Sequence, residues 1–177
     1  MSLFPNQEEP EIPERENSEV KEVFAYFGLC MYNLQIFKQG CVNLAVALQI
    51  KGLTKLIEKD FDSLFDRMSK KTLGQLISDV RDYVNISTKL EEDMNKMLKN
   101  RNYIVHRFFV KHDIVFMSSN GRVEMIEELR GISGNVQVID EKVELITHSL
   151  WKKLGLTAEV VQKELKKMRE EAKQKDL

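Results

Sequence analysis

The sequence predicts an all-α fold, because its apolar residues keep a helical spacing over long segments that contain no proline. All three prolines lie within the first 13 residues, and the eight glycines are scattered along the chain. Hydrophobic residues make up 42% of the chain and charged residues 31%, which is typical of a globular domain with a buried core. We therefore expect a four-helix-bundle-like core with additional C-terminal helices.

The first 17 residues differ in composition from the rest of the chain. Pro5, Pro10 and Pro13 alternate with glutamates, and such a segment cannot bury enough apolar surface to fold. We expect residues 1–17 to form a disordered acidic lead. The helical domain then spans residues 18–155, and Ser18 can act as the N-cap of its first helix.

The longest helix is predicted over residues 23–48, where apolar side chains recur at steps of four and three. The positions are Val23, Phe27, Cys30, Leu34, Phe37, Cys41, Leu44 and Leu48. Gly40 could bend or split this helix. A membrane span is the alternative, because Lys38 is the only charged residue between positions 23 and 50. The five Asn and Gln residues scattered through the segment favour a buried bundle helix instead.

The two cysteines predict a reducing environment. Cys30 and Cys41 are eleven residues apart, so on one helix they are separated by about 16 Å, too far for a disulfide. We interpret them as free thiols of the core. The chain does not open with the pattern of a signal peptide, and we expect a cytoplasmic protein without a membrane segment.

Shorter elements are predicted in the middle of the chain. Residues 61–68 form a short helical segment, and either Ser69 or Thr72 can cap the next helix, which reaches Tyr83. Residues 85–87 read as a turn, and Ser87 can cap a further helix with acidic residues in its first turns. Residues 113–117 have strand-like propensity but are too short and isolated to predict a sheet.

A helical pattern over residues 123–151 indicates one long helix or two consecutive ones, because Gly131 and Gly134 interrupt it. Its apolar positions are Val123, Ile126, Leu129, Val136, Ile139, Val143, Ile146 and Leu150. Gly155 can end this element as a C-cap glycine. Residues 156–177 then form a charged helix or arm, capped by Thr157, that docks on the body or on a partner subunit.

Residues 96–112 concentrate positive charge. The formal net charge of the chain is -1, yet this segment contains lysines and arginines and no Asp or Glu. The cations are Lys96, Lys99, Arg101, Arg107 and Lys111. Such a local patch can attract a polyanion although the chain as a whole is almost neutral.

On a helix, Arg101 falls in the middle of an apolar stripe, and Asn102 and His106 lie together beside its edge. The stripe consists of Leu90, Met94, Met97, Leu98, Ile104, Val105 and Phe108. A cation at such a position is unfavourable unless an anion or a partner surface meets it. Structural alternatives remain open: Arg101 snorkels to solvent, it pairs with a structural carboxylate, or the helix breaks near Asn100.

The order arginine, asparagine, three further residues and histidine, on a late helix of an all-helical domain, resembles the signature of the HEPN superfamily (higher eukaryotes and prokaryotes nucleotide-binding domains). The matching residues are Arg101, Asn102 and His106. Many members are metal-independent endoribonucleases, often in toxin–antitoxin or phage-defence systems. They typically build the active cleft from two copies of the motif across a homodimer. Some members carry a tyrosine two residues after the histidine as a target for nucleotide modification, and this chain has Phe108 there.

The resemblance implies a role for each residue of the motif. His106 would act as general acid or base, Arg101 would stabilise charge on the phosphorane oxygens, and Asn102 would orient the phosphate or the imidazole. The cations Lys99, Arg107 and Lys111 would guide the RNA backbone. The resemblance implies a homodimer, RNA as substrate, a protein antitoxin or regulator as a further partner, and no metal or cofactor.

A non-catalytic function is the alternative to a ribonuclease. In it, the chain is a helical dimerisation or regulatory module that binds a protein or regulates transcription, and Arg101 and His106 serve a structural hydrogen-bond network. We expect His112 on the surface and His148 within the last pair of core helices. The Gly-rich phosphate loops and nucleophile elbows of other enzyme classes are absent from the sequence.

Overall fold

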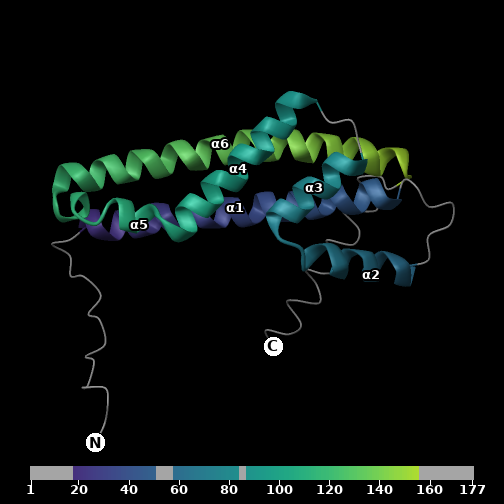
Figure 1. Cartoon of the computed structure of the whole chain (residues 1–177), viewed down its shortest axis with the longest axis horizontal. Coiled ribbons are helices and arrows are strands. Elements are labelled where there is room, and N and C mark those ends of the chain that lie inside the picture. The colour runs from purple at the N-terminus through teal and green to yellow at the C-terminus, as the bar shows by residue number, and fades with distance from the viewer. Residues whose placement is uncertain (1–17, 51–57, 84–86, 156–177) are drawn as a thin grey trace, which may run out of the picture.

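The computed structural model describes residues 18–50, 58–83 and 87–155, and every regular element in these ranges is a helix. The elements are α1 (Ser18–Ile50), α2 (Glu58–Ser69), α3 (Leu73–Tyr83), α4 (Thr88–His106), α5 (Phe108–Lys111), the 3-10 helix η2 (Val115–Met117) and α6 (Ser119–Lys153) (Figure 1). The predicted all-α class is confirmed. The predicted acidic lead, most of the turn at residues 85–87 and the C-terminal arm lie outside the described residues.

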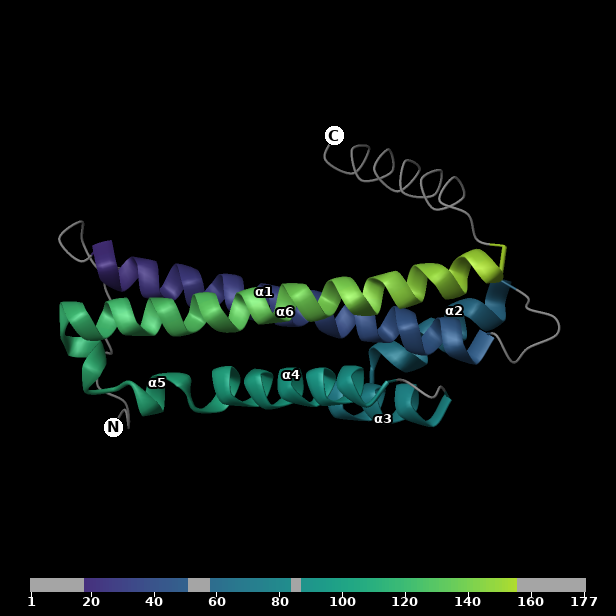
Figure 2. The same cartoon turned by 90° about the horizontal axis from the view of Figure 1, so that it is seen from above.

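The two long helices α1 and α6 lie side by side and run in the same direction (Figures 1 and 2). Near their starts, Arg122 Nη2 donates to Glu19 Oε2 at 2.7 Å. Further along, the buried Asn33 Nδ2 donates to Ser133 Oγ at 2.5 Å. The core therefore forms between two helices that are about a hundred residues apart in the sequence. The helices α2, α3 and α4 connect the end of α1 to the start of α6.

The predicted apolar spacing of α1 is confirmed by burial. Of the eight predicted positions, seven are buried and Phe27 is half-buried and packs against the core. On α6, the buried apolar residues facing them are Met125, Ile126, Leu129, Val136, Ile139 and Val143. Val123, which shares the predicted helical spacing of this segment, lies on α6 but is 51% exposed.

Both long helices are continuous through their glycines. Gly40 of α1 lies close to α6, since a Cβ at this position would stand 2.8 Å from the side-chain atom Asp140 Oδ1. Gly131 and Gly134 are exposed within the single helix α6. Within the described ranges, none of the helices combines the length and apolar character that a membrane span requires.

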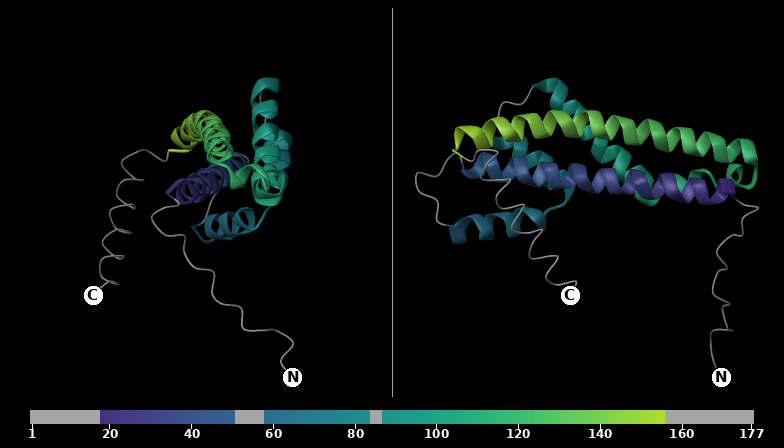
Figure 3. Two further views of the ribbon diagram at one scale, coloured as in Figure 1. Left: turned by 90° about the vertical axis from the view of Figure 1, so that its left-hand side faces the viewer. Right: turned by 180° about the vertical axis from the view of Figure 1, so that it is seen from behind.

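The middle helices pack against one side of the α1/α6 pair. Thr72 caps α3: its hydroxyl accepts from Gln75 N at 3.3 Å, and Gln75 Oε1 accepts from Thr72 N at 2.8 Å. Ser69 instead ends α2. α4, capped by Ser87 as predicted, crosses the long pair diagonally (Figures 1 and 3). The finer prediction of a four-helix-bundle-like core is not confirmed, because α3 is far shorter than α1 and α6 and α4 is inclined to them.

Three local predictions have clear outcomes. The strand-like residues 113–117 contain η2, and Gly155, with φ of 81°, follows the end of α6 as the C-cap prediction required. Cys30 and Cys41 are free and buried, as predicted. Burial raises the pKa of Cys30 to about 11 and also raises the pKa of Cys41, so both stay protonated near neutral pH.

Candidate functional site

The motif occupies the last two turns of α4. This helix runs unbroken through Asn100 and ends at His106, so a break at Asn100 is excluded. Arg107 leaves the helical conformation with φ of -134° and ψ of -17°, and the short helix α5 begins at the next residue. The break therefore places His106 at the end of a helix, next to a change in chain direction.

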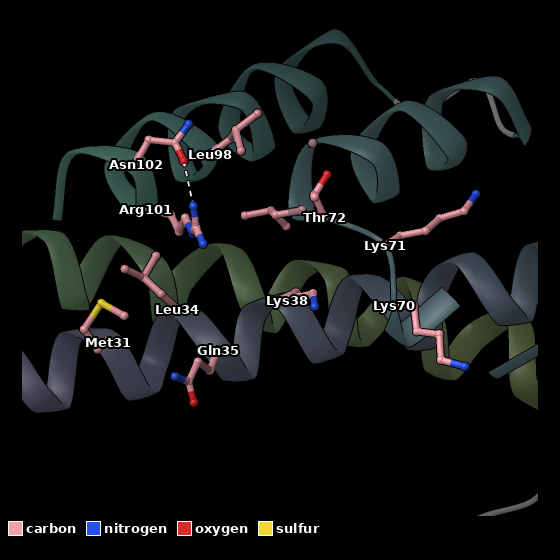
Figure 4. Close-up of a pocket in the computed structure, with 12 residues that line it drawn as sticks. Met31, Leu34, Gln35, Lys38, Lys70, Lys71, Thr72, Leu98, Arg101 and Asn102 are labelled. Atoms are coloured by element: carbon pink, nitrogen blue, oxygen red, sulfur yellow. Dashed lines mark hydrogen bonds between the residues drawn. The ribbon is translucent and has the colours of Figure 1, made fainter. Parts of the chain in front are cut away.

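Arg101 lies on the apolar face of α4 but is exposed. Met97 and Ile104 are buried on the same face. At the level of Arg101, a groove of about 510 Å³ separates α4 from α1 and from the start of α3. Arg101 points into this groove, and its Nη1 donates to Asn102 Oδ1 at 3.1 Å (Figure 4). Within the described residues no carboxylate pairs with it, so among the structural alternatives the solvent-facing one fits.

Asn102 connects this groove to a second hollow. That hollow is wide open to solvent, has a volume of about 530 Å³ and is lined by Asn102, Tyr103, His106 and Arg107. Arg101 and His106 therefore line different hollows of one chain, and Asn102 lines both. The exposed His106 makes no side-chain hydrogen bond to any other residue of the described ranges.

A polar cluster lies directly beside the second hollow, and the sequence did not predict it. His112 Nε2 lies 2.8 Å from Glu128 Oε2 and 3.3 Å from the Tyr103 hydroxyl. Lys111 Nζ lies 3.4 Å from Glu128 Oε1 and 5.1 Å from the centre of the Tyr103 ring. His112 is only 9% exposed, so its prediction as a surface residue is wrong. The cluster ties α4, α5 and α6 together.

Two pKa values reflect this environment. Burial acts to raise the pKa of Glu128, but hydrogen bonds from Tyr103 and His112, together with the charge of Lys111, lower it below its usual value of 4.5. Burial and the nearby Glu128 raise the pKa of the Tyr103 phenol. Glu128 is therefore a carboxylate and Tyr103 a neutral phenol near neutral pH.

The predicted RNA-binding cations have different surroundings. Lys99 and Arg107 are exposed and have no carboxylate partner within the described ranges, and Arg107 lines the hollow of His106. Lys111 is paired with Glu128, which comes from α6. Folding therefore brings the Glu128 carboxylate next to the basic segment, where it partly compensates the charge of Lys111.

Two other residues, His148 and Lys38, have surroundings that the sequence did not predict. His148 lies on α6, one of the two long paired helices, but its side chain is exposed and lines a hollow between α1 and α6, so it is not buried in the core. Lys38 of α1 lines the same groove as Arg101, a position that the motif analysis missed. Its signal in the sequence was its isolation as the only charge between positions 23 and 50. The described residues contain no group of three or more His, Cys, Asp or Glu side chains that could hold a metal ion.

Comparison with known proteins adds no relative. No family model matches the chain, and no curated protein and no solved structure matches it significantly. The resemblance to the HEPN superfamily stays a prediction that rests on Arg101, Asn102 and His106 and on their helical setting.

Proposed function

We propose that the chain is a metal-independent endoribonuclease of the HEPN type. The observation that carries this proposal is the solvent exposure of the motif. Arg101, Asn102 and His106 are all exposed at the C-terminal end of α4. Among the residues that the structure describes, the Arg101 and Asn102 side chains hydrogen-bond only to each other, and the His106 side chain has no hydrogen-bond partner. A purely structural network would use these groups within the fold, so their availability favours a ligand.

The chemistry is transesterification of an RNA phosphodiester. The ribose 2'-oxygen attacks phosphorus, a 2',3'-cyclic phosphate forms, and the 5'-oxygen leaves with a proton. His106 is suited to take or give that proton, and Arg101 to stabilise the charge that grows on the phosphorane oxygens. Asn102 is positioned to orient the phosphate, because it borders both hollows.

A single chain supplies one such imidazole, whereas in-line displacement is best served by an acid and a base on opposite sides. A two-fold dimer that joins two His106 hollows supplies both. Large apolar side chains beside and after the motif support an interface there: Val105, Val110, Ile114 and Met117 are 37%, 75%, 78% and 84% exposed. A role as a toxin or defence component, restrained by a protein antitoxin, follows from the same resemblance.

The test is incubation of the full chain with RNA in EDTA. We expect cleavage by the wild type and a loss of roughly a hundredfold or more in His106→Ala and in Arg101→Ala. His148→Ala is the matched control, because this exposed histidine lines a different hollow, between α1 and α6, which shares no residue with the two hollows of the motif. Circular dichroism of each variant checks that the helices are retained.

The second candidate is a non-catalytic dimerisation or regulatory module. The observation that favours it is the separation of Arg101 and His106 into different hollows. Intact RNA after incubation with wild type, or cleavage by His106→Ala at the wild-type rate, would leave this module as the better account.

A further inference from the structure

We propose that the groove between α1, α3 and α4 binds a nucleotide of single-stranded RNA, with its phosphate between Lys38 and Arg101. The inference rests on the proposed function for its substrate class. Figure 4 shows Arg101 on α4 and Lys38 and Leu34 on α1 pointing into the space between the two helices. Thr72, which directly precedes α3, also lines this groove.

Two of the four cations that line the groove have no carboxylate partner within the described ranges. No Asp or Glu is among its lining residues, although four cations are. Lys70 pairs with Asp66 at 2.6 Å and Lys71 with Asp79 at 2.5 Å, outside the groove. Lys38 and Arg101 have no carboxylate partner within the described ranges.

Lys38 is the more constrained of these two cations. It is half-buried, and its Nζ donates to the backbone carbonyl of Ser69 at 3.2 Å. A carbonyl oxygen satisfies one ammonium proton and does not neutralise the charge. Holding a second cation, Arg101, on the opposite wall is electrostatically unfavourable, and an anion between the two relieves this repulsion.

The rest of the lining suits a nucleotide better than a bare acidic peptide. Met31, Leu34 and Leu98 give the groove an apolar surface against which a base can lie, beside the cations that hold its phosphate. The side chains of Gln35 and Asn102 offer hydrogen-bonding groups to base or ribose. The first turn of α3 also lines the groove, and the positive end of this 11-residue helix adds to the attraction for an anion.

The experiment measures binding of a short fluorescein-labelled single-stranded RNA by anisotropy, in EDTA. The parent protein is the full chain with His106→Ala, so that the RNA stays uncleaved. Adding Lys38→Ala should raise the dissociation constant roughly tenfold and reduce the slope of its logarithm against log salt by about one. Lys21→Ala, which removes an exposed charge from the same helix, is the matched control and should change neither.

Lys38→Arg should keep most of the affinity, which separates loss of charge from loss of fold, and thermal unfolding checks the stability of each variant. Unchanged RNA affinity and salt slope in Lys38→Ala overturn the inference, as does Lys38-dependent binding of poly-glutamate by a parent that binds no RNA. If RNA binds in a Lys38-dependent way but the chain with His106 intact does not cleave it, the proposal of RNA binding in the groove is supported and the proposed ribonuclease activity is contradicted. If cleavage occurs and Lys38→Ala alters neither binding nor cleavage, only the groove fails.

Discussion

At the scale of single residues, the cluster of Tyr103, Lys111, His112 and Glu128 fixes the joint between α4 and α5. It connects three helices through contacts between residues that are 9, 16 and 17 positions apart along the chain. Because Tyr103 lies next to Asn102 in the chain, this cluster holds the backbone that presents Asn102 and His106.

The lowered pKa of Glu128 predicts an acid-dependent stability. A carboxyl whose folded pKa lies below its unfolded value stabilises the fold above that value, here 4.5, and the stabilisation is lost as the pH falls through the folded pKa. Glu128→Gln should therefore lower the melting temperature near pH 7, and the difference from wild type should shrink below pH 4.5. Glu124→Gln, exposed on the same helix, is the control. A difference that does not depend on pH contradicts this account.

The site residues show what sequence could predict at this scale. The helical position of Arg101 on the apolar face was predicted correctly, but its exposure was only one of several open alternatives, because it depends on the groove between α4 and α1. The burial of His112 was missed for a similar reason. Its partner Glu128 belongs to another helix, and periodicity within one segment says nothing about such a contact.

At the scale of elements, the glycines of α6 predict opposite effects of the same substitution. A Cβ on the buried Gly121 would stand 2.0 Å from the backbone oxygen of Val115, and backbone cannot move aside as a side-chain end can. Gly121→Ala should destabilise the fold by about 1–3 kcal/mol. At the exposed Gly134 nothing lies within 4 Å of such a Cβ, so Gly134→Ala should stabilise by about 0.5–1 kcal/mol.

Chemical denaturation of both variants measures the two free energies of unfolding. Equal effects of the same sign would show that the contact between η2 and the start of α6 is looser than described.

Most elements were predictable because their signals are local. The steps of four and three define α1, and Ser87 marks the start of α4. The end of α4 was not predictable, because Phe108 keeps the apolar spacing across the break at Arg107. Val123 shares the spacing of Ile126 and Leu129 but is exposed, because the buried face at the start of α6 is formed by Gly121, Met125, Ile126 and Leu129.

At the scale of the whole molecule, the parallel pairing of α1 and α6 was outside the reach of the sequence. Helical periodicity shows which face is buried and leaves open the neighbour and its direction. The buried hydrogen bond from Asn33 to Ser133 favours a single register of α1 against α6, since a shift of either helix would leave both polar groups unpaired.

Two of the exposed apolar surfaces predict different dimers. Val110, Ile114 and Met117 follow the motif, whereas Ile36 lies on α1 beside the hollow of His148. If the composite site is real, Ile114→Asp should weaken the dimer roughly tenfold or more, because a charge enters its interface, and RNA cleavage should fall with it.

Ile36→Asp is the matched control for this dimer and should leave both properties unchanged. Light scattering across a concentration series gives the oligomeric state, and the EDTA assay gives the activity. A dimer that dissociates in Ile36→Asp but persists in Ile114→Asp would hold the two His106 side chains on the outside. One imidazole would then face each substrate, and a dimer of that kind supports the regulatory module over the ribonuclease.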